Sequence, residues 1–249
     1  MQVWCCAGAA QPTLFIDTPV SDFTKQMDTN YFSGLYIAHA IVRRWLAPSL
    51  SDGPGESSSA APRTGGIPAP RHLIFTASFL ALFPFTGYTP YSPAKAALRA
   101  LSDTLSQELK LYAAANPEQP RVRVHTIFPA TIISEGLETE NLIKTDLTKL
   151  IEEGDNPQTP EVIAAKSIRA LESGQEMITT DFQTGLVRRS MLGASTRGGF
   201  FGGLVDWFLS GWMAIIMVIV RADMDSKVRK WGREHGTSGM KRGGAPGKA

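Results

Sequence analysis

The sequence predicts an α/β fold in which helices connect the strands of a parallel sheet. Two apolar runs, Arg71 to Ser78 and Arg121 to Phe128, have the length and composition of buried strands. Between them, apolar residues recur at helical spacing from Tyr91 to about Tyr112. A strand, a long helix and a second strand in this order pair in parallel, because the helix returns the chain to the end at which the first strand began.

Composition favours one globular domain with appendages. The chain has 249 residues, of which 43% are hydrophobic and 19% charged, enough for a sizeable core. The formal net charge is +2, but the residues from Arg221 onward include eight Lys/Arg and only three Asp/Glu. This basic tail argues against a general nucleic-acid surface. The only cysteines, Cys5 and Cys6, are too few for a disulfide framework, and no spacing suggests a metal site.

The first seventy residues predict a strand, a helix and a flexible insert. Residues 1–8 are a short apolar run that ends at Gly8, which fits a strand followed by a turn. Thr18 and Pro19 start a helix whose apolar stripe continues to Ile41. Residues 47–71 are rich in Pro, Gly, Ser and Ala, with too little apolar surface to order themselves, and we expect a flexible loop.

The second half of the chain predicts a polar loop, a helix and a last strand. Residues 135–158 are acidic and polar around scattered leucines. Thr159 then caps a helix that continues through Glu172, with Pro160 at its first position. Residues 177–180 fit a short final strand. We therefore expect residues 1–195 to form the domain.

A long apolar segment follows this domain, at residues 198–220. It is apolar throughout from Phe200 to Val220 apart from Asp206 and Ser210. Its length permits one tilted transmembrane helix. Two halves that meet at Ser210 and Gly211 fit a hairpin equally well, and a buried core helix is the soluble alternative. The basic tail, residues 221–249, favours the cytosolic side, so we predict a hairpin that enters and leaves the bilayer at one face.

The strongest chemical pattern is a tyrosine and a lysine near the start of the long helix. Tyr91 and Lys95 are four residues apart and therefore share a helix face. A phenol ordinarily titrates near ~10, and a nearby ammonium lowers that pKa. Such a tyrosine can donate a proton to a ketone oxygen, with a second hydrogen bond from Ser78 at the end of the preceding strand. A chance Tyr-x-x-x-Lys pair on a structural helix is the alternative.

Ser78, Tyr91 and Lys95 resemble the catalytic set of the short-chain dehydrogenases/reductases. More narrowly, the segment Phe85 to Lys95 resembles the fungal 3-ketodihydrosphingosine (3-dehydrosphinganine) reductases. The resemblance implies a Rossmann-type doubly wound parallel sheet and a fourth catalytic residue, Asn30, that takes part in a proton relay.

The resemblance also implies NADPH as the cofactor. Its binding residues in this chain are those that match the family's cofactor segments: Gly8, Tyr91, Lys95, Pro129, Ile132 and Ser134. Cys5 replaces an asparagine and Ala130 a glycine of the family pattern. The family's glycine-rich turn, which holds the cofactor pyrophosphate at a helix N-terminus, has no counterpart in this sequence. We therefore expect an N-terminally truncated chain whose sheet lacks its first strands, and NADP over NAD rests on the resemblance alone.

The implied reaction is NADPH-dependent reduction of 3-ketodihydrosphingosine to dihydrosphingosine in sphingolipid biosynthesis. The implied location is the endoplasmic reticulum membrane, with the catalytic domain in the cytosol and homo-oligomers allowed. Two alternatives stay open: a non-catalytic membrane-attached remnant without its cofactor loop, and a reductase for a steroid or another long-chain ketone.

Overall fold

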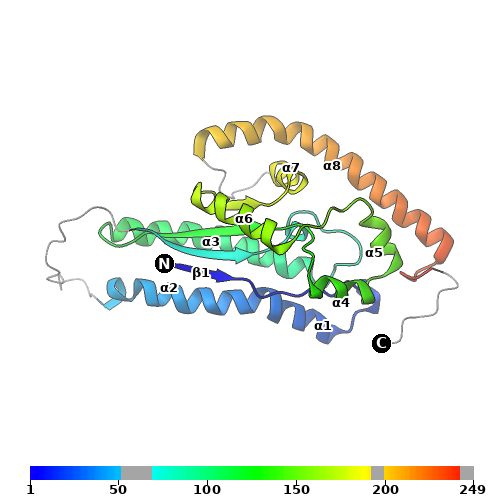
Figure 1. Ribbon diagram of the computed structural model, residues 1–249, viewed down its shortest axis with the longest axis horizontal. Coiled ribbons are helices and arrows are strands. Elements are labelled where there is room, and N and C mark those ends of the chain that lie inside the picture. Colours follow the sequence, from blue (N-terminus) through cyan, green and yellow to red (C-terminus); the bar gives the residue numbers. More distant parts are fainter. Residues whose placement is uncertain (52–68, 192–198, 242–249) are drawn as a thin grey trace.

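Four parallel strands lie side by side in one sheet, in the order β1-β2-β3-β4 (Figure 1). The computed structural model describes residues 1–51, 69–191 and 199–241. The parallel sheet confirms the predicted α/β class. The strands are β1 (Gln2–Cys5), β2 (Arg71–Thr76), β3 (Val122–Phe128) and β4 (Met177–Thr179).

The described residues contain eleven helical segments, of which the first, η1 (Phe15–Asp17), is a single 3-10 turn. The 3-10 turn η3 and the π-helical turn η2 are the other short elements. The ten segments other than η1 are α1 (Val20–Met27), η2 (Asp28–Phe32), α2 (Ser33–Ser51), η3 (Phe79–Ala81), α3 (Ser92–Ala115), α4 (Glu135–Ile143), α5 (Asp146–Ile151), α6 (Pro160–Glu172), α7 (Phe182–Ser190) and α8 (Gly199–His235).

The two faces of the sheet bury different helices. Side chains alternate along a strand, so Leu73 and Phe75 of β2 point to one face and Ile74 to the other. The first face packs against α2 and α3. The second face, which includes Ile127 and Ile178, packs against α6. Burial on both sides explains why the central strands are almost uninterrupted apolar runs.

Several element ends agree with the sequence patterns. The α6 helix spans Pro160–Glu172, and the Thr159 hydroxyl accepts a hydrogen bond from the Val162 amide at 3.5 Å. The first part of the predicted flexible insert is helical instead, because α2 continues to Ser51; residues 52–68 lie outside the described residues.

The polar segment 135–158 is not the loop that its composition suggested. It forms α4 and α5, each with a hydroxyl side chain at its N-terminus. Ser134 accepts a hydrogen bond from the Leu137 amide, and Thr145 accepts one from the Thr148 amide, both at 3.2 Å. Short helices of this kind depend on capping and docking more than on a continuous apolar stripe.

The predicted hairpin at Ser210 and Gly211 is wrong, because α8 is one continuous helix of 37 residues (Figure 1). The Ser210 hydroxyl donates to the Trp207 carbonyl at 2.7 Å, which satisfies the hydroxyl without breaking the helix. Gly211 is not among the glycines with positive φ, so the backbone does not turn there. The helix packs on α7, where Asp206 forms an ion pair with Arg189 at 2.7 Å.

Candidate active site

The predicted site residues gather at the carboxyl edge of the sheet. Gly8 follows β1, Ser78 follows β2, and Pro129 follows β3. The loops after β2 and β3 are joined directly, because the Phe79 amide donates to the Pro129 carbonyl at 2.8 Å. This edge is where ligands bind in open parallel sheets.

Tyr91 and Lys95 lie next to one another at the start of α3. Tyr91 is the residue before the helix, and Lys95 Nζ lies 5.6 Å from the centre of its ring. The Lys95 side chain is buried, and its ammonium donates to the Thr76 carbonyl at 3.0 Å. Ser78 hydrogen-bonds the Tyr91 side chain. The structure therefore brings together the three residues that the sequence singled out.

The pKa of Tyr91 is shifted in the direction opposite to the predicted one. Burial raises the pKa of the Tyr91 phenol above its ordinary value, the Glu140 carboxylate raises it further, and the hydrogen bond with Ser78 only partly opposes this. Burial lowers the pKa of Lys95 to about 8. Burial is the main cause of both shifts, and the Lys95 ammonium donates to the Thr76 carbonyl. In this state Tyr91 is a protonated acid.

Asn30 lies in the π-helical turn η2, a kind of helix irregularity that is frequent at functional sites. Its side chain is almost fully buried and reaches the loop after β1. Its Oδ1 accepts from the Ala9 amide at 3.1 Å, and its Nδ2 donates to the Ala9 carbonyl at 2.9 Å. The same Nδ2 also donates to Gln26 Oε1 at 2.9 Å. Sequence reasoning missed Gln26, although its position four residues before Asn30 places both on one helix face.

Gly8 fits between the side chains of Asn30 and Lys95. A Cβ atom at Gly8 would lie 2.8 Å from Lys95 Nζ and 2.9 Å from Asn30 Oδ1, closer than packed atoms allow. Both groups are thus in the immediate surroundings of Gly8. Cys5, which replaces the family's asparagine, is buried and its thiol lies 4.0 Å from the Gly34 carbonyl.

The remaining predicted cofactor residues lie in the segment that leads from β3 into α4. Ile132 forms an isolated parallel bridge with Gln158, and the adjacent Ile133 amide donates to the Gln158 carbonyl at 2.9 Å. Ser134 starts α4, as its hydroxyl caps that helix. Among the described residues no group of three or more His, Cys, Asp or Glu could hold a metal ion.

Solved structures with the same arrangement identify the fold. A short-chain dehydrogenase from Burkholderia cenocepacia in complex with NADP superposes with a TM-score of 0.54 at 15% identity, covering 76% of this chain and 62% of that one. A short-chain dehydrogenase from Sphingobium yanoikuyae in complex with NADPH superposes with a TM-score of 0.52 at 15% identity, covering 72% of this chain and 56% of that one. The chain has the short-chain dehydrogenase/reductase fold. No family profile matches it.

Within this fold, the chain is homologous to fungal 3-ketodihydrosphingosine reductases. It is 41% identical to that of Aspergillus fumigatus over 242 residues, which covers 94% of this chain and 62% of the relative. It is 37% identical to the reductase of Neurospora crassa over 235 residues, which covers 94% of this chain and 59% of the relative. The chain therefore spans about three fifths of the length of the relatives that it matches.

A largely buried charged network beside the candidate site was not predicted. The Tyr88 hydroxyl contacts Glu140 Oε1 at 2.5 Å and Glu152 Oε1 at 2.6 Å. Lys144 Nζ pairs with the same two carboxylates, at 3.1 Å and 2.7 Å. The Tyr88 ring lies 6.2 Å from the Tyr91 ring, so the network joins α4 and α5 to the start of α3. Glutamates scattered in a polar stretch gave no sequence pattern that could have revealed it.

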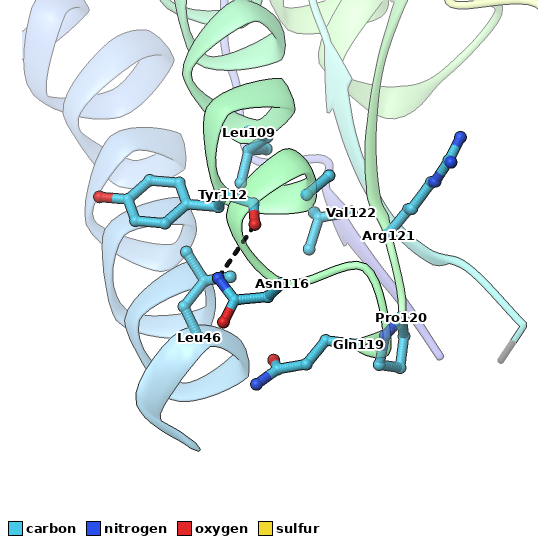
Figure 2. Close-up of a pocket in the computed structure, with 9 residues that line it drawn as sticks. Leu46, Leu109, Tyr112, Asn116, Gln119, Pro120, Arg121 and Val122 are labelled. Atoms are coloured by element: carbon cyan, nitrogen blue, oxygen red, sulfur yellow. Dashed lines mark hydrogen bonds between the residues drawn. The ribbon is translucent and has the colours of Figure 1, made fainter. Parts of the chain in front are cut away.

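A small surface pocket lies away from this site (Figure 2). It is lined by residues at the ends of α2 and α3 and at the start of β3, including Leu46, Leu109 and Val122. The Asn116 side-chain amide donates there to the Tyr112 carbonyl at 3.0 Å and closes the last turn of α3 (Figure 2). Since α3 has 24 residues and rises ~1.5 Å for each, the pocket lies roughly 30 Å from Tyr91.

Proposed function

We propose that the protein reduces 3-ketodihydrosphingosine to dihydrosphingosine with NADPH. The observation that carries this proposal is the meeting of Ser78, Tyr91, Lys95 and Asn30 at one edge of the sheet. Its support from relatives is the 41% identity to a fungal enzyme of that name. The fold alone is compatible with many ketones, so the substrate follows from the relatives rather than from the site.

The residues at the site fit the nicotinamide end of the cofactor. Lys95 is buried, and an ammonium has three donors, of which the described residues engage one through the Thr76 carbonyl. The other donors suit a ribose hydroxyl and a water molecule. We assign the cofactor contacts to Gly8, Tyr91, Lys95, Pro129, Ile132 and Ser134. When bound, NADPH supplies the hydride. No glycine-rich turn for a pyrophosphate is found in the described part of the chain.

The protein's own residues supply the proton. The raised pKa keeps the Tyr91 phenol protonated at neutral pH, so it can donate to the ketone oxygen as that oxygen gains charge. Ser78 donates a second hydrogen bond to the same oxygen, which stabilises the developing charge. Once Tyr91 has lost its proton, the adjacent Lys95 ammonium stabilises the phenolate. Asn30 holds the loop after β1 in place beside that ammonium.

We further propose that the enzyme works at the endoplasmic reticulum membrane with its catalytic domain in the cytosol. A ketosphingoid base has a long alkyl chain, and each methylene kept out of water is worth ~0.8 kcal/mol, so the substrate resides in bilayers. The described residues include one helix, α8, that is long and apolar enough to cross a membrane. Only 17% of its most apolar window is buried.

The test is an NADPH-oxidation assay of the purified chain in mixed micelles that contain 3-ketodihydrosphingosine. We expect Tyr91→Phe to lower kcat by about 100-fold or more, because a positioned proton donor contributes roughly 10²–10⁴. Tyr112→Phe, at the far end of the same helix, is the matched control and should retain full activity. Wild-type turnover by Tyr91→Phe would refute the mechanism.

Two further measurements address the alternatives. A folded chain that binds no NADPH in a fluorescence titration would support the non-catalytic remnant. Faster turnover of steroid or other long-chain ketones than of 3-ketodihydrosphingosine would instead change the substrate and keep the enzyme.

A further inference from the structure

In the first half of α8, two polar side chains are buried while large apolar side chains are exposed. Asp206 and Ser210 are each 3% exposed, and Asp206 pairs with Arg189 of α7. Trp207, in contrast, is 71% exposed. A surface helix of a soluble protein has the reverse arrangement, with its apolar stripe against the core. The outward apolar side chains include Phe201, Leu204, Phe208, Ile215 and Ile219.

The side of α8 that is buried in its first half is buried again near its end. Met213 and Trp231 are both buried, and they are eighteen residues apart, which is about five turns at ~3.6 residues each. Ile215 and Arg233 are also eighteen residues apart and are both exposed. The outward face is therefore continuous, apolar in its first half and basic in its second. Exposed Arg229 and Lys230 add to the basic half.

Both ends of α8 are attached to the same domain. At the start, Arg189 of α7 pairs with Asp206. Beyond the end, the Leu147 amide of α5 donates to the Gly239 carbonyl at 3.0 Å. The Lys241 amide likewise donates to the Asp146 carboxylate at 3.0 Å. The chain after α8 thus returns to the segment that lies beside the candidate site (Figure 1).

We infer that α8 lies in the plane of a bilayer with anionic lipids, with its outward face immersed and both its ends on the side of the domain. A single crossing would require one end of α8 to leave the domain and would carry the basic half across the membrane. In the in-plane orientation, the apolar half enters the hydrocarbon boundary while the basic half meets the headgroups. At ~1.5 Å per residue, 37 residues extend about 55 Å, well beyond the roughly 30 Å of a hydrocarbon core.

Cysteine accessibility in sealed microsomes tests this orientation without requiring enzyme activity. Native Cys6, which is exposed, reports on the domain. In a Cys6→Ser background, Thr237→Cys reports on the chain beyond α8 and Ile215→Cys on the outward face, while Ser210→Cys is the matched control on the inward face. Each full-length variant is treated with a membrane-impermeant maleimide before and after detergent.

We expect Cys6 and Thr237→Cys to react in intact microsomes, and Ile215→Cys to react at least tenfold faster once detergent is added. Ser210→Cys should stay slow in both, since the side chain at this position is buried. Protection of Thr237→Cys while Cys6 reacts would show a single crossing. Rapid reaction of Ile215→Cys in intact microsomes would show that no lipid covers it. A soluble dimer protected at Ile215→Cys would show that a second copy covers this face. Each of these three results overturns the inference.

Discussion

Three of the four polar side chains of the candidate site are hydrogen-bonded to main-chain atoms. Asn30 holds the loop after β1, Lys95 holds the end of β2, and Ser78 accepts from the Leu80 amide at 3.2 Å. Main-chain partners move little, so the side chains are fixed before any ligand arrives, as an electrostatic site requires. At this scale small changes in backbone position should matter more than changes in surface charge.

Gly8 provides the sharpest residue-scale prediction. In Gly8→Ala the new methyl group would displace Lys95 Nζ or Asn30 Oδ1, because both lie within 3 Å of its position. We expect reductase activity to fall by at least tenfold while the protein stays folded, as measured by NADPH oxidation and circular dichroism. The matched control is Gly232→Ala in α8, where a Cβ meets nothing within 4 Å. That change should leave activity intact and stabilise the helix by roughly 0.5–1 kcal/mol. Equal activity in both variants would contradict the close packing at Gly8.

Residue spacing predicted which site residues meet, but not their proton affinities. Helical periodicity placed Tyr91 and Lys95 on one face, and the structure agrees. The pKa of Tyr91 was predicted in the wrong direction, because sequence spacing reports proximity and not burial. The charge of Glu140 in α4, about fifty residues further along the chain, adds to the effect of burial. Gln26 and the π-helical turn that carries Asn30 have no local pattern that distinguishes them from an ordinary helix.

At the scale of elements, α4 and α5 are held to the site by one buried cation. A phenol has a single proton, so Tyr88 can donate to only one of the two carboxylates that it contacts. Lys144 neutralises one of the two negative charges. Burial alone would lower the pKa of Lys144, but the two carboxylates outweigh this and raise it, so the ammonium persists well above neutral pH.

Removal of this cation should loosen α4 and α5. We expect Lys144→Met to reduce the free energy of unfolding by about 2 kcal/mol, because it leaves two partly buried carboxylates without a counter-charge. Urea denaturation measures the loss, and hydrogen exchange should show the largest increase in α4 and α5. Exposed Lys149→Met is the matched control, with an expected change within about 0.5 kcal/mol. In Lys144→Met/Glu152→Gln much of the loss should be recovered, and no recovery would show that packing of the lysine stem dominates.

At the scale of the whole molecule, the order of elements was predictable and their lateral contacts were not. Alternating strands and helices predicted the parallel sheet, since parallel strands need such crossovers. The hairpin prediction failed at Ser210 and Gly211, where small polar residues look like a turn in a sequence. In the structure Ser210 is instead buried within a continuous helix, and the neighbouring Asp206 pairs with Arg189 of α7, a contact between segments that sequence periodicity does not reveal.

The exposed apolar side chains of α8 should determine how well the enzyme reaches a substrate that resides in the membrane. A triple variant that combines Phe201→Ser, Phe208→Ser and Ile215→Ser removes exposed apolar groups and leaves the buried face of α8 unchanged. We expect this variant to stay folded and to be soluble without detergent. With 3-ketodihydrosphingosine in vesicles its turnover should fall at least tenfold, because the long chain keeps the substrate in the bilayer at ~0.8 kcal/mol for each methylene.

A water-soluble 2-amino-3-ketone with a short alkyl chain separates membrane access from chemistry. The triple variant should reduce it at the wild-type rate, because Tyr91, Ser78 and Lys95 are untouched. The matched control combines Tyr36→Ser, Leu111→Ser and Ile168→Ser, which are exposed apolar residues on α2, α3 and α6. This control should retain turnover of both substrates. Equal losses on the short and long ketones would show that α8 supports the fold of the site, whereas a loss confined to the long ketone is expected if the helix delivers the enzyme to its substrate.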